Sequence, residues 1–385
     1  MFPMSSGKKI GLILGVLCVA VGGAYYFKLW PFASREPRQA IEIENGKSVA
    51  NNEPEPMKNT GPVSPISGLP CDNWNRRPVA VMQPADVSAR PAAGFSEADM
   101  VFEMPVVTAS ITRLMAVYVC GNPDDVGSMR SARHDYIALA KGLDAIFVHW
   151  GGSHYAIDKL KEGVIDDMNC NNDGGKSSQQ YCYRKPLEDL AKNHAFPQVP
   201  PKGDDTGYAK FSKLLEGAKA FGYRMTNNFT GYPHQNPLSE DQRTASGHLR
   251  VAFAGPFAAT YDYDRASNTY LRTWGGVADM DRNNGKRIAP SNIVVVIARS
   301  SQIIEGIQYN NVQIGDPWYD DTDSGDAYYY MNGQEMKGTW KKDKSSLDSK
   351  LTFFDKNAQE VKFIPGQIWV EVLEPGQGLS WEPAQ

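Results

Sequence analysis

The sequence predicts a mixed α+β or α/β protein that follows an N-terminal membrane anchor and a polar stalk. Three observations support this class: an apolar stretch near the N-terminus, strands that alternate with helices, and a later run of strands separated by turns. We therefore expect a membrane anchor over residues 1–30 and a flexible stalk over 31–71. An α/β domain with a central sheet then spans 72–225, and a mostly β C-terminal domain spans 245–376.

The anchor is an almost continuous apolar stretch from Ile10 to Trp30 that follows Lys8 and Lys9. At a rise of about 1.5 Å per residue, roughly twenty apolar residues span the hydrocarbon core of a bilayer. The lysine pair favours a cytoplasmic N-terminus and an extracytoplasmic remainder. Two alternatives stay open, namely a cleaved secretory signal and a lipid-modified Cys18, although the residue before Cys18 is larger than such sites require.

Composition limits the possible partners. The stalk is rich in Pro, Glu, Asn and Ser and has few large apolar residues, which is typical of a flexible linker. The net charge of −4 offers no basic surplus, so nucleic acid is excluded as a partner. An aromatic content of 11% and a charged content of 22% are typical of a folded chain beyond the stalk.

Four cysteines lie outside the anchor, an even number in a chain that we expect to face an oxidising space. Cys170 and Cys182 flank a polar loop that a local disulfide would close, which leaves Cys71 to pair with Cys120. Free thiols are the alternative. A zinc site is less well supported, because the chain has no Cys-x-x-Cys motif or closely spaced Cys/His group.

The α/β domain is predicted from short apolar runs and helical spacing. Strands are expected at 79–82, 111–119 and 144–149, and helices at 132–143, 153–162 and 208–221. The polar interval 163–207 is either a surface loop near a site or an insertion.

The C-terminal domain is predicted from strands separated by turn residues. They are expected at 249–255, 259–264, 269–274, 292–298, 327–332, 338–342, 350–355 and 368–373. Asn332 and Gly333 predict a type I′ hairpin. The alternation of Val370, Glu371 and Val372 predicts a half-buried strand.

Several blocks of the chain resemble a known family. They are NRRPVAVM, ARPAAGFSEADMVFE, ITRLMAVY, VGSMRSARHDYIALAK, DAIFVHWGG, YDYDRASNTYLR, GDAYYYMNGQEMKGTW and PGQIWVEVL. In this order they resemble the YerB-like family of bacterial lipoproteins, a two-domain family of unknown function. The resemblance implies a role in the cell envelope and supplies no catalytic residues. Because the chain lacks a convincing lipobox, we expect a helix rather than a lipid to anchor it.

An anion site is predicted from a dense group of arginines in the α/β domain. Arg130 and Arg133 lie in SMRSAR, where a strand leads into a helix, so their guanidinium groups and free helix N–H groups could hold a phosphate or carboxylate. The full group comprises Arg90, Arg113, Arg130 and Arg133. The alternative is a set of structural ion pairs with the nearby acids Glu97, Asp99, Glu103 and Asp135.

The motif HWGGSH is the second candidate. His149 ends a predicted strand, Gly151 and Gly152 permit close approach of the backbone to a ligand, and Ser153 could cap the next helix. Ligands of open α/β sheets gather at such strand ends. Because no G-x-S-x-G motif is present, a capping role for Ser153 is favoured over a nucleophilic one.

No metal site is predicted from the sequence, and the sequence leaves any cofactor undecided. The string Asp279–Gly285 differs from a calcium loop in the position of its glycine and in its lack of a final glutamate. The acidic group around Asp321 and Asp323 is interpreted as a solvated turn.

These observations leave three function classes. We favour a single-pass membrane protein of the cell envelope with an extracytoplasmic C-terminal part, which binds an anionic ligand, an envelope polymer or a partner protein. The alternative is an envelope enzyme that acts on phosphorylated, isoprenoid-linked intermediates through its arginines; its layout loosely resembles that of LytR–CpsA–Psr phosphotransferases. The least favoured class is a hydrolase that uses Ser153 or the acids. The sequence does not decide whether the protein is an enzyme.

Overall fold

The computed structural model describes residues 61–107, 111–253, 255, 258–303, 309–319 and 321–384. The predicted anchor and most of the predicted stalk lie outside these residues. Among the described residues, no helix is long and apolar enough to cross a membrane. All described residues belong to one compact unit, Glu53–Gln385.

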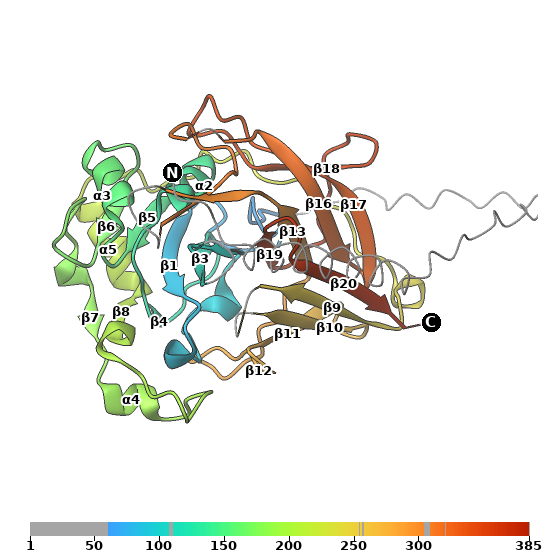
Figure 1. The fold of residues 1–385 in the computed structure, drawn as a ribbon, viewed down its shortest axis with the longest axis horizontal. Coiled ribbons are helices and arrows are strands. Elements are labelled where there is room, and N and C mark those ends of the chain that lie inside the picture. The colour runs from blue at the N-terminus through green and yellow to red at the C-terminus, as the bar shows by residue number, and fades with distance from the viewer. Residues whose placement is uncertain are drawn as a thin grey trace, which may run out of the picture. The chain divides into compact units, whose positions relative to one another are not determined.

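A mixed ten-stranded sheet forms the centre of this unit (Figure 1). Strands from both predicted domains take part in it, because β19 pairs with β2 in parallel register. In spatial order the strands are β18 (Thr352–Asp355), β17 (Gln334–Lys341), β16 (Ser324–Met331), β13 (Asn292–Ile297), β19 (Ile368–Leu373), β2 (Met100–Pro105), β3 (Thr112–Tyr118), β1 (Val79–Pro84), β5 (Ile146–His149) and β6 (Asp167–Asn169).

The central strands of this sheet are covered on both faces. All six residues of β19 are buried, so the predicted half-buried strand at Val370–Val372 is wrong. The reason is its position between β13 and β2, where neither face meets solvent. Glu371 therefore carries its carboxyl group into the protein interior.

Two hydrophobic layers pack on the two faces of the sheet. Successive residues of β1 point to opposite faces, so Ala80 belongs to one layer and Val81 to the other. The first layer includes the helix residues Tyr136 and Ile157. The second layer includes Leu249 and other residues of a second sheet.

That second sheet is antiparallel and has five strands (Figure 1). Its strand β11 alternates buried and half-buried residues, as expected for a sheet with one face packed and one face exposed. In spatial order the strands are β12 (Val277–Ala278), β11 (Thr269–Trp274), β10 (Ala259–Asp264), β9 (Ser246–Ala252) and β20 (Gly378–Pro383).

The predicted hairpin at residues 332–333 is confirmed. Asn332 and Gly333 both adopt positive φ, at 56° and 70°, and connect the antiparallel strands β16 and β17. A type I′ turn requires positive φ at both central residues, which Asn and Gly tolerate best.

The remaining described elements are helices and short strands. The α-helices are α2 (His134–Gly142), α3 (His154–Lys161), α4 (Leu187–Ala191) and α5 (Phe211–Ala220). The 3₁₀-helices are η1 (Val87–Ala89), η2 (Phe95–Glu97), η3 (Gln179–Tyr181), η4 (Gly203–Thr206) and η5 (Glu240–Gln242). Two small sheets contain β14 (Ser300–Gln302) with β15 (Asn310–Val312), and β4 (Asp125–Gly127) with β8 (Gly207–Lys210) and β7 (Tyr183–Arg184).

The predicted helix at 208–221 is confirmed only from Phe211 onwards. Its first three residues belong to β8, which pairs with β4 on one side and β7 on the other. Both partners are distant in the sequence, so local spacing could not reveal this strand.

Candidate functional site

Three of the four predicted arginines meet at one edge of the ten-stranded sheet. The parallel strands β1 and β5 end there at Pro84 and His149. Arg113 belongs to β3 and lies opposite Pro84 in the antiparallel β1–β3 pair. The N–H of Arg130 donates to a β1 carbonyl at 2.9 Å, and its C=O accepts the N–H of the residue after β5 at 3.0 Å. Arg133 follows immediately as the N-cap residue of α2.

Arg113 and Arg133 form no ion pair with a carboxylate among the described residues. The Nη1 of Arg113 donates to the C=O of Ser131 at 2.8 Å, and the guanidinium carbon of Arg133 lies 5.9 Å from the ring centre of Tyr309. Burial, together with the positive charges of Arg133 and Arg130, lowers the pKa of Arg113 to about 9. Burial also lowers the pKa of Arg133. The Nε groups of both arginines are buried without a hydrogen-bond partner in the structure.

Arg130, by contrast, is held by three carboxylates. It lies 2.8 Å from Asp86, 3.4 Å from Asp204 and 3.3 Å from Asp205. Arg130 therefore forms structural ion pairs, but its partners are not the four acids that the alternative named, which were Glu97, Asp99, Glu103 and Asp135. Its contacts fix the segment that carries Arg133.

Arg90 lies apart from the other three arginines. It packs against Phe95 and Trp274, which belong to the hydrophobic layer next to the five-stranded sheet, and its Nη1 lies 3.5 Å from Asp279. Burial lowers its pKa although Asp279 opposes this change. Only 2% of its surface is exposed, so it does not share an accessible site with Arg113.

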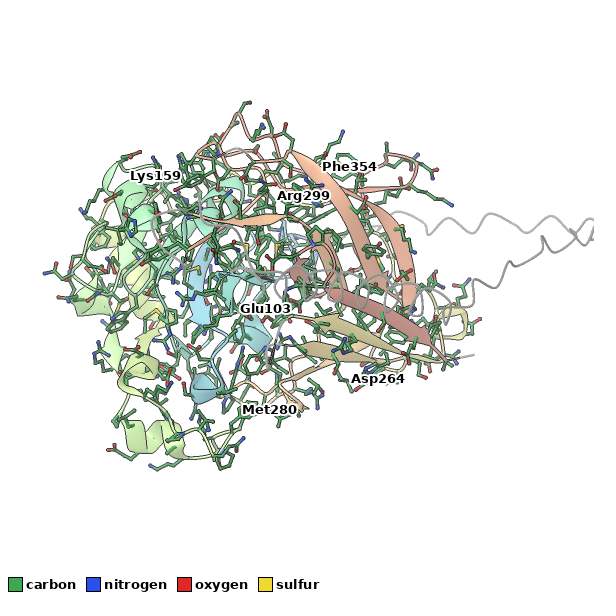
Figure 2. The ribbon with its side chains drawn as sticks, in the orientation of Figure 1. Glu103, Lys159, Asp264, Met280, Arg299 and Phe354 are labelled. Carbon is green, nitrogen blue, oxygen red and sulfur yellow. A yellow bond between two sulfur atoms is a disulfide. The ribbon has the colours of Figure 1, made fainter. Side chains whose placement is uncertain are left out.

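The sequence did not predict a buried network of charged residues that lies near Arg90. Arg272 of β11 enters the space between the two sheets and pairs with Glu103 and Asp279, while its Nε donates to the hydroxyl of Tyr261 at 3.0 Å. Glu371 accepts the Tyr261 hydroxyl and lies 4.0 Å from the Nε of Arg272. Glu103, which Figure 2 labels, is fully buried. Its adjacency to Glu371 comes from the β2–β19 register, which local sequence does not reveal.

The HWGGSH motif is built into the backbone at the same sheet edge. His149 is fully buried, with Nδ1 2.8 Å from the C=O of Gly151 and Nε2 3.3 Å from Asp167. Gly151 has a φ of +68°, and Gly152 forms a parallel bridge to the segment that precedes α2. Ser153 is the N-cap of α3, and its Oγ accepts an N–H of the first turn at 3.2 Å. The predicted capping role of Ser153 is confirmed.

Both predicted disulfides are present. Cys71 bonds to Cys120 and Cys170 bonds to Cys182, with Cα–Cα distances of 5.9 and 5.8 Å. This pairing supports an oxidising environment for the described part of the chain.

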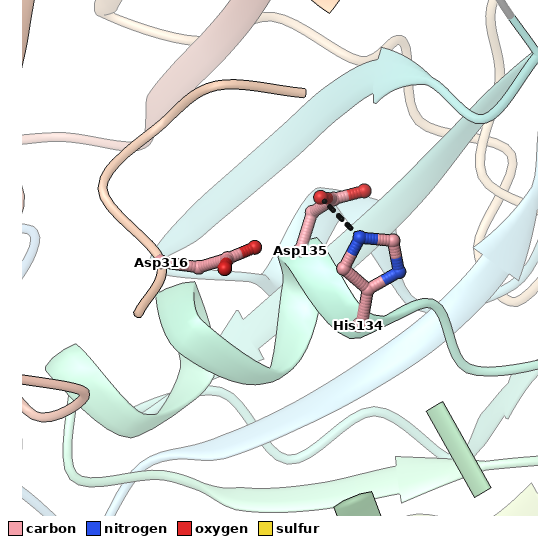
Figure 3. A group of neighbouring side chains, drawn as sticks. All are labelled: His134, Asp135 and Asp316. Carbon is pink, nitrogen blue, oxygen red and sulfur yellow. Dashed lines mark ion pairs between the residues drawn. The ribbon is translucent and has the colours of Figure 1, made fainter. Parts of the chain in front are cut away.

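The sequence also did not predict a second polar cluster. His134 and Asp135 begin α2, and Asp316 approaches them from the segment after β15 (Figure 3). Burial disfavours the charged imidazole of His134 and by itself lowers its pKa. The negative charge and the hydrogen bond of the adjacent Asp135 outweigh the effect of burial, so the pKa of His134 rises to about 9. Burial and the charges of Asp135 and Asp321 raise the pKa of Asp316 to about 7. The solvated turn predicted around Asp321 is wrong at this residue, because Asp321 is buried.

Known proteins share this architecture. Residues 66–219 match the family model described as the N-terminal domain of DUF3048, a protein of unknown function, and residues 249–370 match its C-terminal domain. The "Putative lipoprotein YerB" of Bacillus subtilis (strain 168) is 28% identical over 320 residues, which cover 80% of this chain and 86% of that protein. The crystal structure of YerB from Bacillus subtilis is similar with a TM-score of 0.67 and 25% identity, covering 83% of this chain and 99% of the other. The chain therefore belongs to the YerB-like family, with both domains of that family in order.

Proposed function

We propose that this protein binds an anionic ligand, a phosphate-bearing component of the cell envelope, through Arg113 and Arg133. The observation that carries the proposal is that these two guanidinium groups lie close enough to repel each other and have no carboxylate partner among the described residues. A bound phosphate would offset that repulsion.

The position of the arginines also suits a ligand. Arg113, Arg130 and Arg133 are each half-buried, so water reaches them while much of each side chain is held in place. They lie where the parallel strands β1 and β5 end and where α2 begins, and strand ends and helix N-termini both favour anions. The pairing of Arg130 with its three acids orients the segment without neutralising Arg113 or Arg133.

An envelope location is supported by the two disulfides and by the description of a relative as a lipoprotein. The predicted anchor at Ile10–Trp30 lies outside the described residues. A single-pass helix with an extracytoplasmic C-terminal part therefore remains a proposal, as does a partner protein or wall polymer.

Calorimetric titration of the full chain in detergent micelles with inorganic pyrophosphate and farnesyl diphosphate tests the proposal. Both should bind, and farnesol should not. Arg133→Ala and Arg113→Ala should each weaken binding about tenfold or more, because a charge-assisted pair is lost. Arg250→Ala, which removes an exposed arginine from β9, is the matched control. An absence of pyrophosphate binding, or equal binding by all three variants, would contradict the proposal.

The enzyme alternative has one observation in its favour. His134 and Asp135, which carry an acid and a base group, follow Arg133 directly in the sequence, and both side chains are buried. If the protein hydrolyses such ligands, with water as the acceptor, incubation of the purified chain with farnesyl diphosphate should release phosphate or pyrophosphate. If the ligand stays intact after prolonged incubation, the protein binds it without converting it.

A further inference from the structure

The cluster at the start of α2 has the composition and compactness of a metal site. His134, Asp135 and Asp316 each offer a ligand atom, and these atoms all lie within 4.8 Å of one another. Their exposed fractions are 2%, 1% and 0%, so bulk water does not solvate the two carboxylates. Figure 3 shows the three side chains converging from α2 and from the segment that contains Asp316.

Several atoms of the cluster have no hydrogen-bond partner. They are Nδ1 of His134, Oδ2 of Asp135 and Oδ2 of Asp316. The one close contact within the group joins Nε2 of His134 to Oδ1 of Asp135 at 3.0 Å. A charged imidazole could pair with that one oxygen, but the second oxygen of each carboxylate would stay unsatisfied. Buried carboxylate oxygens in this state require a partner, and a bound cation is one that satisfies both carboxylates together.

The surrounding residues hold the cluster in place. The Oδ1 of Asn311 lies 3.1 Å from Nε2 of His134, and the Nδ2 of Asn311 donates to Asp321 at 2.9 Å. The other oxygen of Asp321 accepts the N–H groups of Ile314 at 2.9 Å and Asp316 at 3.1 Å. Asp321 therefore orients both Asn311 and Asp316, as residues around metal ligands commonly do.

We propose that His134, Asp135 and Asp316 bind a divalent first-row transition metal ion, with the Oδ1 of Asn311 as a fourth ligand. One imidazole nitrogen combined with carboxylate and amide oxygens suits Zn²⁺ or Mn²⁺ better than Ca²⁺, which prefers oxygen ligands alone. The site does not depend on the anion-binding proposal, because it uses none of the arginines.

Metal binding is tested on the full chain in detergent micelles, which is stripped with EDTA, incubated with Zn²⁺ or Mn²⁺, and then dialysed against metal-free buffer. Elemental analysis should find one equivalent of Zn²⁺ or Mn²⁺ retained, and either ion should raise the melting temperature while Ca²⁺ should not. Asp316→Asn should abolish both effects. Asp326→Asn removes an exposed acid from β16 and should keep them. Asp321→Asn should weaken the affinity roughly 10- to 100-fold.

Two results would overturn the proposal. One is an unmodified protein that retains no Zn²⁺ or Mn²⁺, and the other is retention by Asp316→Asn equal to that of the unmodified protein. If Asp316→Asn fails to fold, pulsed electron paramagnetic resonance of the unmodified protein with Mn²⁺ decides. The spectrum should show coupling to one histidine nitrogen, and its absence would equally overturn the proposal. Unchanged pyrophosphate binding after EDTA treatment would confirm that the two sites are separate.

Discussion

Glu371 gives a sharp test of the buried charges between the two sheets. Its carboxyl group is fully buried, accepts the hydroxyl of Tyr261 and lies near Arg272. Burial, and then the negative charge of Glu103, raises its pKa to about 8. The perturbation is Glu371→Gln, which keeps the size of the side chain and removes its titrating proton.

The expected effect follows from proton linkage. In the unfolded chain the pKa of this glutamate is near 4.5. Between that value and about 8, the folded protein holds a proton that the unfolded chain has released. The stabilisation is therefore complete below pH 4.5, and it is lost as pH rises through this window. One proton changes the free energy of unfolding by about 1.4 kcal/mol per pH unit.

Urea unfolding, followed by tryptophan fluorescence between about pH 5.5 and 7, measures this slope. Relative to the unmodified protein, Glu371→Gln should gain about 1.4 kcal/mol of stability for each pH unit. Glu382→Gln, which changes an exposed acid on β20, should show no such gain. If the difference between Glu371→Gln and the unmodified protein stays constant across this range, Glu371 is ionised in the folded state and the reasoning is refuted.

Two further predictions concern single features of the fold. Ser153→Ala should lower the free energy of unfolding by about 1 kcal/mol through loss of the α3 cap, with pyrophosphate binding unchanged; a large loss of binding would contradict a capping role. Replacing the Cys71–Cys120 pair by alanine should cost about 4 kcal/mol, and replacing Cys170–Cys182 about 3 kcal/mol, because the sequence separations are 49 and 12. Chemical denaturation should give that order, and the reverse order would argue against a loop-entropy origin.

Local patterns predicted many of the elements, but not the central strand β2 or the edge strand β6. The strand at Val79–Pro84, the helix at His134–Gly142 and the hairpin at residues 332–333 depend on spacing and turn chemistry that a short segment contains. The strand at Gly207–Lys210 was missed because its partners β4 and β7 are distant in the chain.

The candidate site was predicted only in part for the same reason. Arg130 and Arg133 are close in the sequence, and their placement before a helix was visible. Arg90 was grouped with them wrongly, because sequence proximity does not show which face of the sheet a residue occupies. Asp316 was not connected with Asp135, since only the docking of the segment after β15 onto α2 brings them together.

The sequence by itself determined the family, the alternation of strands and helices, and the disulfide pairing, because these depend on motif order, local periodicity and cysteine position. Only the tertiary structure decided that strands of both predicted domains join in one sheet, that Glu371 and Arg272 are buried, and that His134 meets Asp316. These features arise from strand pairing and packing between distant segments, for which no local pattern carries a signal.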